Sequence, residues 1–189
     1  MTDLKHEFTY NGYVRAFADR FVRIKMTDAE IKKANHWVIK MQEAKLPDFF
    51  GANDFRNAHQ RIFSGVIGEM AVEKYIGKEF IDWSIGKAVD YQKPDLHSIG
   101  LEYGVKTALH GKFPIIYKKN TYPQVFVIYR QSDQTAFVCG IASVEVLNRY
   151  QSDDLVISPF LKAKKIKTAF YGFGALESPS KLLENIDKN

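Results

Sequence analysis

Cysteine is almost absent from this chain: Cys139 is the only one among 189 residues. A single cysteine excludes an internal disulfide and a thiolate-rich zinc site, which favours a reducing, cytoplasmic compartment. Long apolar runs are missing as well, because no stretch approaches the roughly 18 residues that a membrane-spanning helix needs. Residues 1–5 are polar and lack the apolar centre of a secretion signal. We therefore expect a cytoplasmic protein with no membrane partner.

Acidic residues are fewer than basic ones: the chain has 22 aspartates and glutamates against 27 lysines and arginines, which gives a formal net charge of +5. This excess is compatible with a polyanionic partner but does not require one. Hydrophobic residues make up 46% of the chain and aromatics 14%, which is enough for a sizeable core. The length predicts one domain over 1–189, with a helical, aromatic-rich extension over about 1–50 and a core over about 53–175.

A first helix is predicted after a capping box formed by Thr27 and Glu30, a hydroxyl and a carboxylate three residues apart. Apolar residues then repeat at helical spacing to about Lys45, and Pro47 is expected to end the helix. The residues before the capping box mix aromatics with arginines. Their pattern leaves a strand pair and a short helix equally open.

A second helix is predicted between a cap at Asn53-Asp54 and a stop at Gly77. Its inner stripe consists of Ile62, Val66, Glu69, Val72 and Ile76. An ionised carboxylate within an apolar stripe is costly unless it is paired or bound to a metal. Glu69 is therefore either a site residue or a residue rotated to the helix rim beside a basic neighbour. The preceding Gly68 would also let another segment approach closely.

Strands are predicted in the second half of the chain, from Pro94 onward. Residues 95–97 and 101–107 are expected to form a hairpin around a tight turn. Residues 124–130 are expected as a buried strand and residues 135–141 as its neighbour. Helices flanking a mixed central β-sheet define an α/β fold, here a three-layer sandwich with an N-terminal helical extension.

Residues around the predicted hairpin form a candidate site. Strand residues two apart share a face, so Glu102, Gly104 and Lys106 are expected to point the same way, opposite Asp95, while the alternating apolar residues face the core. An aspartate after a proline is commonly a turn residue, and Glu102 and Lys106 by themselves fit an ordinary solvated strand face. Combined with Glu69, however, these carboxylates and the lysine are a set that can hold Mg²⁺ and polarise a water molecule.

Together these residues resemble the PD-(D/E)XK nuclease superfamily, which has the restriction-endonuclease-like fold. The resemblance covers roughly Gly65 to Ala142 and is carried by short motifs. These are Gly68-Glu69-Met70-Ala71-Val72, Pro94-Asp95, Tyr103-Gly104-Val105-Lys106-Thr107-Ala108, Tyr122-Pro123-Gln124-Val125-Phe126-Val127 and Phe137-Val138-Cys139-Gly140-Ile141. One position departs from the family pattern, because Gly104 stands where an acid is expected two residues before the lysine.

The resemblance implies a metal-dependent nuclease, a hydrolase of phosphodiester bonds with DNA favoured over RNA. Mg²⁺ would be the cofactor and Mn²⁺ a substitute, and a homodimer and a role in phage or restriction biology would be in keeping with the family. The implied catalytic residues are Glu69, Asp95, Lys106 and Gln124, and the implied metal ligands are Glu69, Asp95, Glu102 and the carbonyl of Val105. Glu69 or Glu102 would supply the acid that is missing at Gly104.

Two groups of lysines are candidates for contacts with nucleic-acid phosphates, although charge runs are more often solvated surface. They are Lys112, Lys118 and Lys119 after the Lys106 strand, and Lys162, Lys164, Lys165 and Lys167 near the C-terminus. The alternative to a nuclease is a catalytically inactive nuclease-fold protein that binds nucleic acid or a protein partner. Gly104 would explain that loss of activity.

Overall fold

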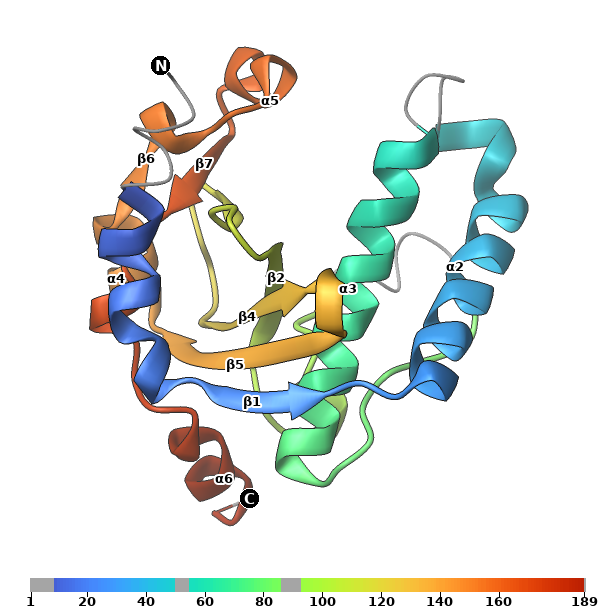
Figure 1. The fold of residues 1–189 in the computed structure, drawn as a ribbon, viewed down its shortest axis with the longest axis horizontal. Coiled ribbons are helices and arrows are strands. Elements are labelled where there is room, and N and C mark those ends of the chain that lie inside the picture. The colour runs from blue at the N-terminus through green and yellow to red at the C-terminus, as the bar shows by residue number, and fades with distance from the viewer. Residues whose placement is uncertain (1–8, 50–54, 86–92, 189) are drawn as a thin grey trace.

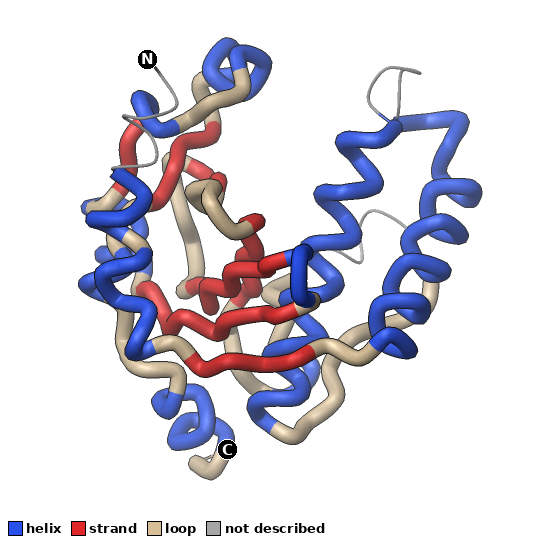
Figure 2. Tube along the Cα trace, in the orientation of Figure 1, coloured by secondary structure: helices blue, strands red, loops and turns tan. Residues whose placement is uncertain are grey.

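A mixed four-stranded β-sheet forms the centre of the computed structural model, which describes residues 9–49, 55–85 and 93–188 (Figures 1 and 2). Its strands are β1 (Val22–Lys25), β2 (Gly104–Leu109), β4 (Gln124–Arg130) and β5 (Thr135–Ala142). Their order is β1-β5-β4-β2, with β2 parallel to β4 and β5 antiparallel to both of its neighbours. The protein is thus an α/β fold with a mixed sheet flanked by helices, as the sequence predicts. The segment expected as an N-terminal extension contributes the edge strand β1.

A second, smaller sheet is built from short strands of the second half of the chain. Its order is β3-β7-β6 and both pairs are antiparallel. The strands are β3 (Ile115–Tyr117), β6 (Gln151–Ser152) and β7 (Lys167–Phe170), and the nearby short helices are α4 (Val144–Arg149), α5 (Pro159–Lys164) and α6 (Ser180–Ile186). Short 3-10 helices are η1 (Arg15–Arg20), η3 (His97–Ile99), η4 (Gln131–Asp133), η5 (Asp153–Leu155) and η6 (Phe173–Ala175).

Helix α2 (Asp28–Phe49) begins at the predicted capping box. The Thr27 amide donates to Glu30 Oε2 at 2.7 Å and the Glu30 amide donates to the Thr27 hydroxyl at 3.2 Å, which confirms the box. The expected end near Lys45 is wrong, because the helix continues through Pro47 to Phe49. Pro47 lies within the last turn, where the missing amide donor interrupts little of the remaining helix.

Helix α3 (Phe55–Ile76) packs directly on the sheet and against α2, as Figure 1 shows. The cap expected at Asn53-Asp54 lies outside the described residues. The predicted stop is confirmed, because Gly77 adopts a φ of +67° just after the helix. A side chain at Gly68 would collide with the Thr107 hydroxyl on β2, so glycine is what lets the helix and the strand approach each other. This contact places the next residue, Glu69, beside the edge of the sheet.

Both faces of the central sheet are covered, so the fold has two cores. On one face, Val125 and Val127 of β4 pack with α3 and α2. On the other face, Phe126 packs with Phe170 of β7, their stacked rings 4.4 Å apart between centroids. Burial of β4 along almost its whole length confirms the predicted buried strand. The side of β2 expected to face away from the core is covered too, since Gly104 is buried.

The hairpin predicted ahead of β2 is wrong. Residues 97–99 form the 3-10 helix η3, closed by Gly100 at a φ of +82°. The Leu96 amide donates to the Tyr103 carbonyl at 3.0 Å and the Leu101 amide donates to the Leu96 carbonyl at 3.2 Å, two hydrogen bonds that close a turn in place of a strand ladder. Leu96 is fully buried and anchors this turn in the core, so Asp95 lies in a compact turn and not on a strand. Within the residues that the structure describes, no helix is long and apolar enough to cross a membrane.

Candidate functional site

The site predicted from the sequence lies where α3 meets the outer strand β2. Glu69 comes from the middle of α3, Asp95 from the turn that precedes β2, and Lys106 from β2 itself. The three charges are close enough to act on one another, because Asp95 and Lys106 both shift the pKa of Glu69. The fold therefore brings together the three residues on which the sequence hypothesis chiefly depends.

The surroundings of Glu69 and Asp95 disfavour the ionised form of both carboxylates. Loss of hydration, together with the negative charges of Asp95 and Glu73, raises the pKa of Glu69 to about 8, against an opposing effect of Lys106. Loss of hydration also raises the pKa of Asp95, although the Val105 amide and Lys106 oppose this. The pKa of Lys106 is lowered, chiefly by loss of hydration. One lysine thus does not balance two carboxylates, and a further cation would stabilise their ionised forms.

Asp95 is held in place by the backbone of β2. Its Oδ2 accepts the Val105 N–H at 2.5 Å. The N–H and C=O of one strand residue point to the same side of the strand. The Val105 carbonyl therefore also faces the outer edge of β2, on the side where Asp95 lies.

Position 104, where the family pattern has an acid, has no room for a side chain. A Cβ on Gly104 would lie 2.6 Å from Gln124 Oε1 and 2.8 Å from Tyr122 Cε2. Gly104 and Gln124 are register partners in the parallel pair of β2 and β4, so they share one face of the sheet. Gln124 is only 7% exposed. Its carboxamide fills the space in which a side chain at position 104 would begin.

Tyr122 connects this carboxamide to the carboxylates. Burial and the charge of Asp95 raise the pKa of Tyr122, while a hydrogen bond with the Gln124 side chain opposes the shift. The tyrosine hydroxyl therefore lies within the influence of both groups. The sequence did not mark Tyr122 as a site residue, because a tyrosine before a proline and a strand is an ordinary feature of loops.

The structure distinguishes Glu69 from Glu102, the two residues that could supply the acid missing at position 104. Glu69 lies close enough to Asp95 for the Asp95 charge to raise its pKa. Glu102 precedes β2, is exposed, and places Oε1 2.5 Å from Nδ1 of His97. Because Glu102 is already engaged with His97, Glu69 is the acid that the structure brings to Asp95.

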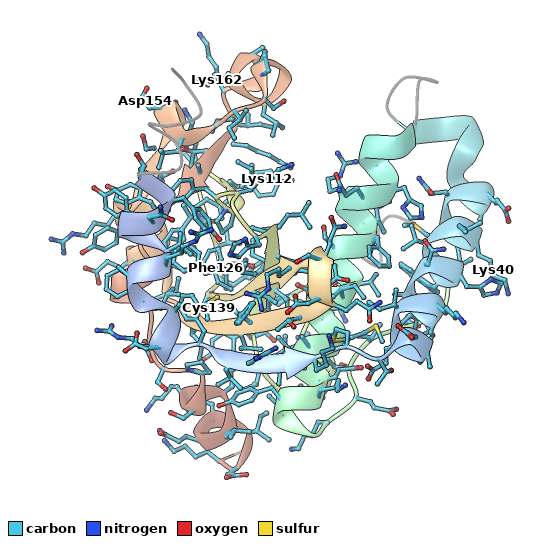
Figure 3. The ribbon with its side chains drawn as sticks, in the orientation of Figure 1. Lys40, Lys112, Phe126, Cys139, Asp154 and Lys162 are labelled. Atoms are coloured by element: carbon cyan, nitrogen blue, oxygen red, sulfur yellow. The ribbon has the colours of Figure 1, made fainter. Side chains whose placement is uncertain are left out.

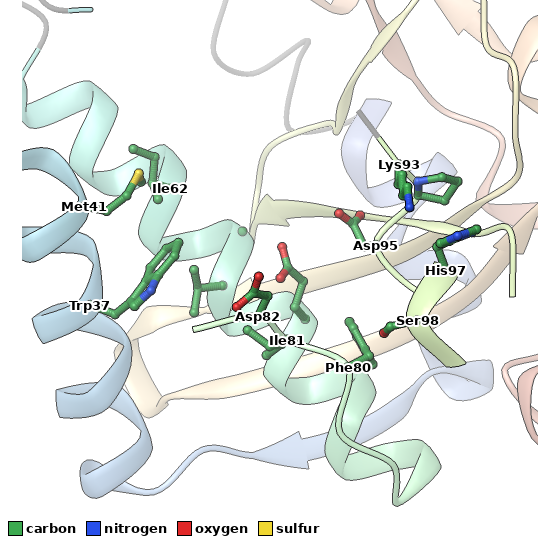
Figure 4. A pocket seen from close by; sticks show the side chains of 14 residues that line it. Trp37, Met41, Ile62, Phe80, Ile81, Asp82, Lys93, Asp95, His97 and Ser98 are labelled. Carbon is green, nitrogen blue, oxygen red and sulfur yellow. The ribbon is translucent and has the colours of Figure 1, made fainter. Parts of the chain in front are cut away.

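A cavity of about 620 Å³ opens beside the carboxylates (Figure 4). Its polar lining includes Glu69, Asp82, Lys93, Asp95 and His97, and its apolar lining includes Trp37, Met41 and Ile62 from α2 and α3. Asp82 was missed in the sequence because it lies in a segment with no periodic pattern. Its Oδ1 accepts the Ser84 amide at 2.9 Å, a local turn contact that carries no sign of a distant site.

The donor set at this junction suits Mg²⁺. Across residues 9–49, 55–85 and 93–188 no three histidine, cysteine, aspartate or glutamate side chains are arranged to hold a metal ion. Mg²⁺ does not require three, since it is commonly held by one or two carboxylates together with water and substrate phosphates. Glu69 and Asp95 supply two hard oxygen ligands whose charges are otherwise unbalanced. The chemistry of these residues therefore fits the ion.

The lysines predicted to contact phosphates are spread over two regions. Lys167 lies nearest the site, because its charge helps to lower the pKa of Lys106. Lys118 is paired with Asp153 at 2.5 Å. The exposed members are Lys112, Lys119, Lys162 and Lys165, of which Figure 3 labels Lys112 and Lys162 on the flank of the molecule that carries α5. The side chain of Lys164 lies outside the described part of the structure.

Comparisons of the chain with protein-family models, with curated proteins and with solved structures found no match. A function can therefore be argued only from the site itself. That site consists of two carboxylates, a lysine and a buried carboxamide around the outer strand of a mixed sheet.

Proposed function

We propose that this chain is a metal-dependent nuclease with a restriction-endonuclease-like fold, which hydrolyses phosphodiester bonds in nucleic acid, DNA in preference to RNA. The observation that carries the proposal is the meeting of Glu69, Asp95 and Lys106 at the outer edge of β2. Three elements that are separate in the sequence deliver these side chains to one place. Two carboxylates next to a lysine are a donor set suited to a divalent cation and a phosphate.

Glu69 and Asp95 would hold Mg²⁺, or Mn²⁺ in its place, with the Val105 carbonyl as a neighbouring oxygen. When bound, the ion lowers the pKa of a coordinated water and polarises the scissile phosphate. The hydrogen bond from the Val105 amide fixes the orientation of Asp95. Glu69 must release its proton to act as a ligand, so its raised pKa links metal binding to pH.

Lys106 and Gln124 would act on the substrate and the attacking water. The Lys106 ammonium offsets the negative charge that develops on the phosphate oxygens. Its lowered pKa makes the ammonium group a stronger proton donor than an exposed lysine. Gln124 shares the face of the sheet that carries Lys106, and its carboxamide can both donate to and accept from that water. The amide is uncharged, so Glu69 and Asp95 carry the negative charge of the proposed site.

A second candidate function is binding of nucleic acid without cleavage. The observation that favours it is Gly104, where both the acid and the room for one are absent. The two functions differ in what they require of the carboxylates. Cleavage needs Glu69 and Asp95, whereas binding of a polyanion would be weakened by their negative charge.

Cleavage assays separate these functions. Supercoiled DNA, single-stranded DNA and RNA are incubated with Mg²⁺ or Mn²⁺ and the wild type, Glu69→Gln, Asp95→Asn or Lys106→Met, each checked for folding by circular dichroism. We expect the wild type to cut and each variant to lose about 100-fold or more. Glu145→Gln, which removes an exposed carboxylate from α4, should cut normally. If the wild type cuts no substrate with either ion but retards DNA in a gel, binding without cleavage replaces the nuclease proposal.

A further inference from the structure

An exposed aromatic ring and a lysine are presented together on the small sheet. Tyr117 ends β3 and is 51% exposed. Lys167 begins β7 and is its register partner, so both side chains project from the same face of an antiparallel pair. Lys167 Nζ lies 4.9 Å from the centroid of the Tyr117 ring. The pair offers a cation beside a ring that remains half exposed.

This pair lies next to the candidate site. Lys167 and Tyr117 are both among the groups whose charges act on Lys106. The chain passes from β2 to β3 through one short loop, and the two strands are in contact. Lys106 and Lys167 therefore form a positive region on the side of the site away from Glu69. Such a region attracts a phosphate adjacent to the one at the carboxylates.

Backbone hydrogen bonds pair the two strands that carry this surface, and the side chain of Tyr117 lies mostly outside the core. The Lys118 amide donates to the Ile166 carbonyl at 3.1 Å, which extends the pairing of β3 with β7 by one step. Ile166 is itself 55% exposed. The aromatic core on this side is already filled by Phe126 and Phe170. Tyr117 therefore does not serve the packing of the interior.

We propose that Tyr117 and Lys167 form a platform for an unpaired nucleotide beside the scissile phosphate. The base stacks on Tyr117 and its phosphate contacts Lys167. This inference rests on the proposed function and assigns the substrate class: a single strand, or a strand end whose bases are free. A base inside a duplex is stacked on both sides by its neighbours, whereas every free base offers a face to an aromatic ring regardless of sequence.

The test measures binding without cleavage, by fluorescence anisotropy in EDTA. The probes are a labelled single-stranded oligonucleotide and the same strand annealed to its complement. Tyr117→Ala should weaken single-strand binding about tenfold and duplex binding much less, and Tyr117→Phe should keep the wild-type affinity. Lys167→Gln should lower the slope of log affinity against log salt for the single strand by about 0.7.

Two variants control for exposure and charge. Tyr13→Ala removes a tyrosine of similar exposure, 46%, in the N-terminal segment. Lys40→Gln removes a lysine that Figure 3 shows on the outer side of α2. Both should bind single strands as the wild type does. The platform is refuted if Tyr117→Ala also binds like the wild type, or if it loses single-strand and duplex affinity equally. A wild type that cuts DNA while Tyr117→Ala binds normally overturns the platform alone, whereas a wild type that neither binds nor cuts overturns the proposed function as well.

Discussion

Substitution of Gly104 by alanine tests directly whether Gln124 occupies the place of the missing acid. The new Cβ would lie 2.6 Å from Gln124 Oε1 and 2.8 Å from Tyr122 Cε2, well inside the contact distance of about 3.5 Å. Because Gln124 is only 7% exposed, its amide cannot simply move into solvent. Overpacking of this kind costs about 1–3 kcal/mol, and the loss of glycine's freedom in the unfolded chain returns about 0.4–1 kcal/mol. We expect Gly104→Ala to lower the free energy of unfolding by about 1–2 kcal/mol.

A double-mutant cycle in urea assigns this loss to its cause. Gln124→Ala removes the amide, so alanine at position 104 should cost about 1 kcal/mol less in the Gln124→Ala background than in the wild type. Gly65→Ala is the matched control, because nothing lies within 4 Å of a Cβ at that helical glycine; it should stabilise the protein by about 0.5–1 kcal/mol. A coupling energy within about 0.5 kcal/mol of zero, or a Gly104→Ala variant as stable as the wild type, would refute the close contact between position 104 and Gln124. It would then also refute the idea that the Gln124 carboxamide fills the space of a side chain at position 104.

Three further substitutions test the site and its support. In metal-free buffer, stability should fall as pH rises from about 4.5 to about 8, because native Glu69 keeps its proton in that window while the unfolded chain releases it. The contribution of Glu69 to the slope approaches about 1.4 kcal/mol per pH unit. Urea titrations of Glu69→Gln should lose this contribution and keep only the smaller one of Asp95, whose pKa is also raised. Thr107→Val should be neutral or stabilising by up to about 1 kcal/mol in the same assay, because the Thr107 hydroxyl is buried without a hydrogen-bond partner among the described residues; a marked loss would mean that the hydroxyl is satisfied. Thr27→Ala should lower the free energy of unfolding by about 1 kcal/mol, with Thr27→Ser close to the wild type; equal stability of all three would contradict the capping box.

The elements that could be predicted are those whose signals are local in the sequence. The capping box at Thr27 and Glu30 depends on residues three apart, and the stop at Gly77 depends on one residue that tolerates a positive φ. The strand over residues 124–130 has a continuous apolar run at 125–129 because the sheet is covered on both faces. Glu69 was found because it breaks an apolar stripe, and a break of that kind needs no knowledge of the partner that it meets.

The features that could not be predicted depend on contacts between distant segments. Residues 95–97 have an extended pattern, but burial of Leu96 and the positive φ of Gly100 turn them into a compact loop. The small sheet consists of strands two to four residues long, too short for alternation to be distinguished from chance. The hydrogen bond that the described residues give to the Asp82 carboxylate is a local turn contact, so nothing in the sequence connects Asp82 to the cavity. The platform at Tyr117 likewise exists only because β3 pairs with β7.

Gly104, which departs from the PD-(D/E)XK pattern, is best understood together with Gly68, because each glycine leaves space for a side chain of a neighbouring strand. Gly68 lets α3 lie against β2, which brings the carboxylate of Glu69 to Asp95. Gly104 leaves room on the opposite face of the strand for the carboxamide of Gln124. In the proposed site, Glu69 of α3 supplies the charge and the oxygen ligand that an acid at position 104 would give, while the carboxamide of Gln124 from β4 fills the space at that position. The space at Gly68 is filled by the side chain of Thr107 and the space at Gly104 by the carboxamide of Gln124. A side chain at Gly68 would therefore push α3, which carries Glu69, away from β2, and a side chain at Gly104 would displace Gln124.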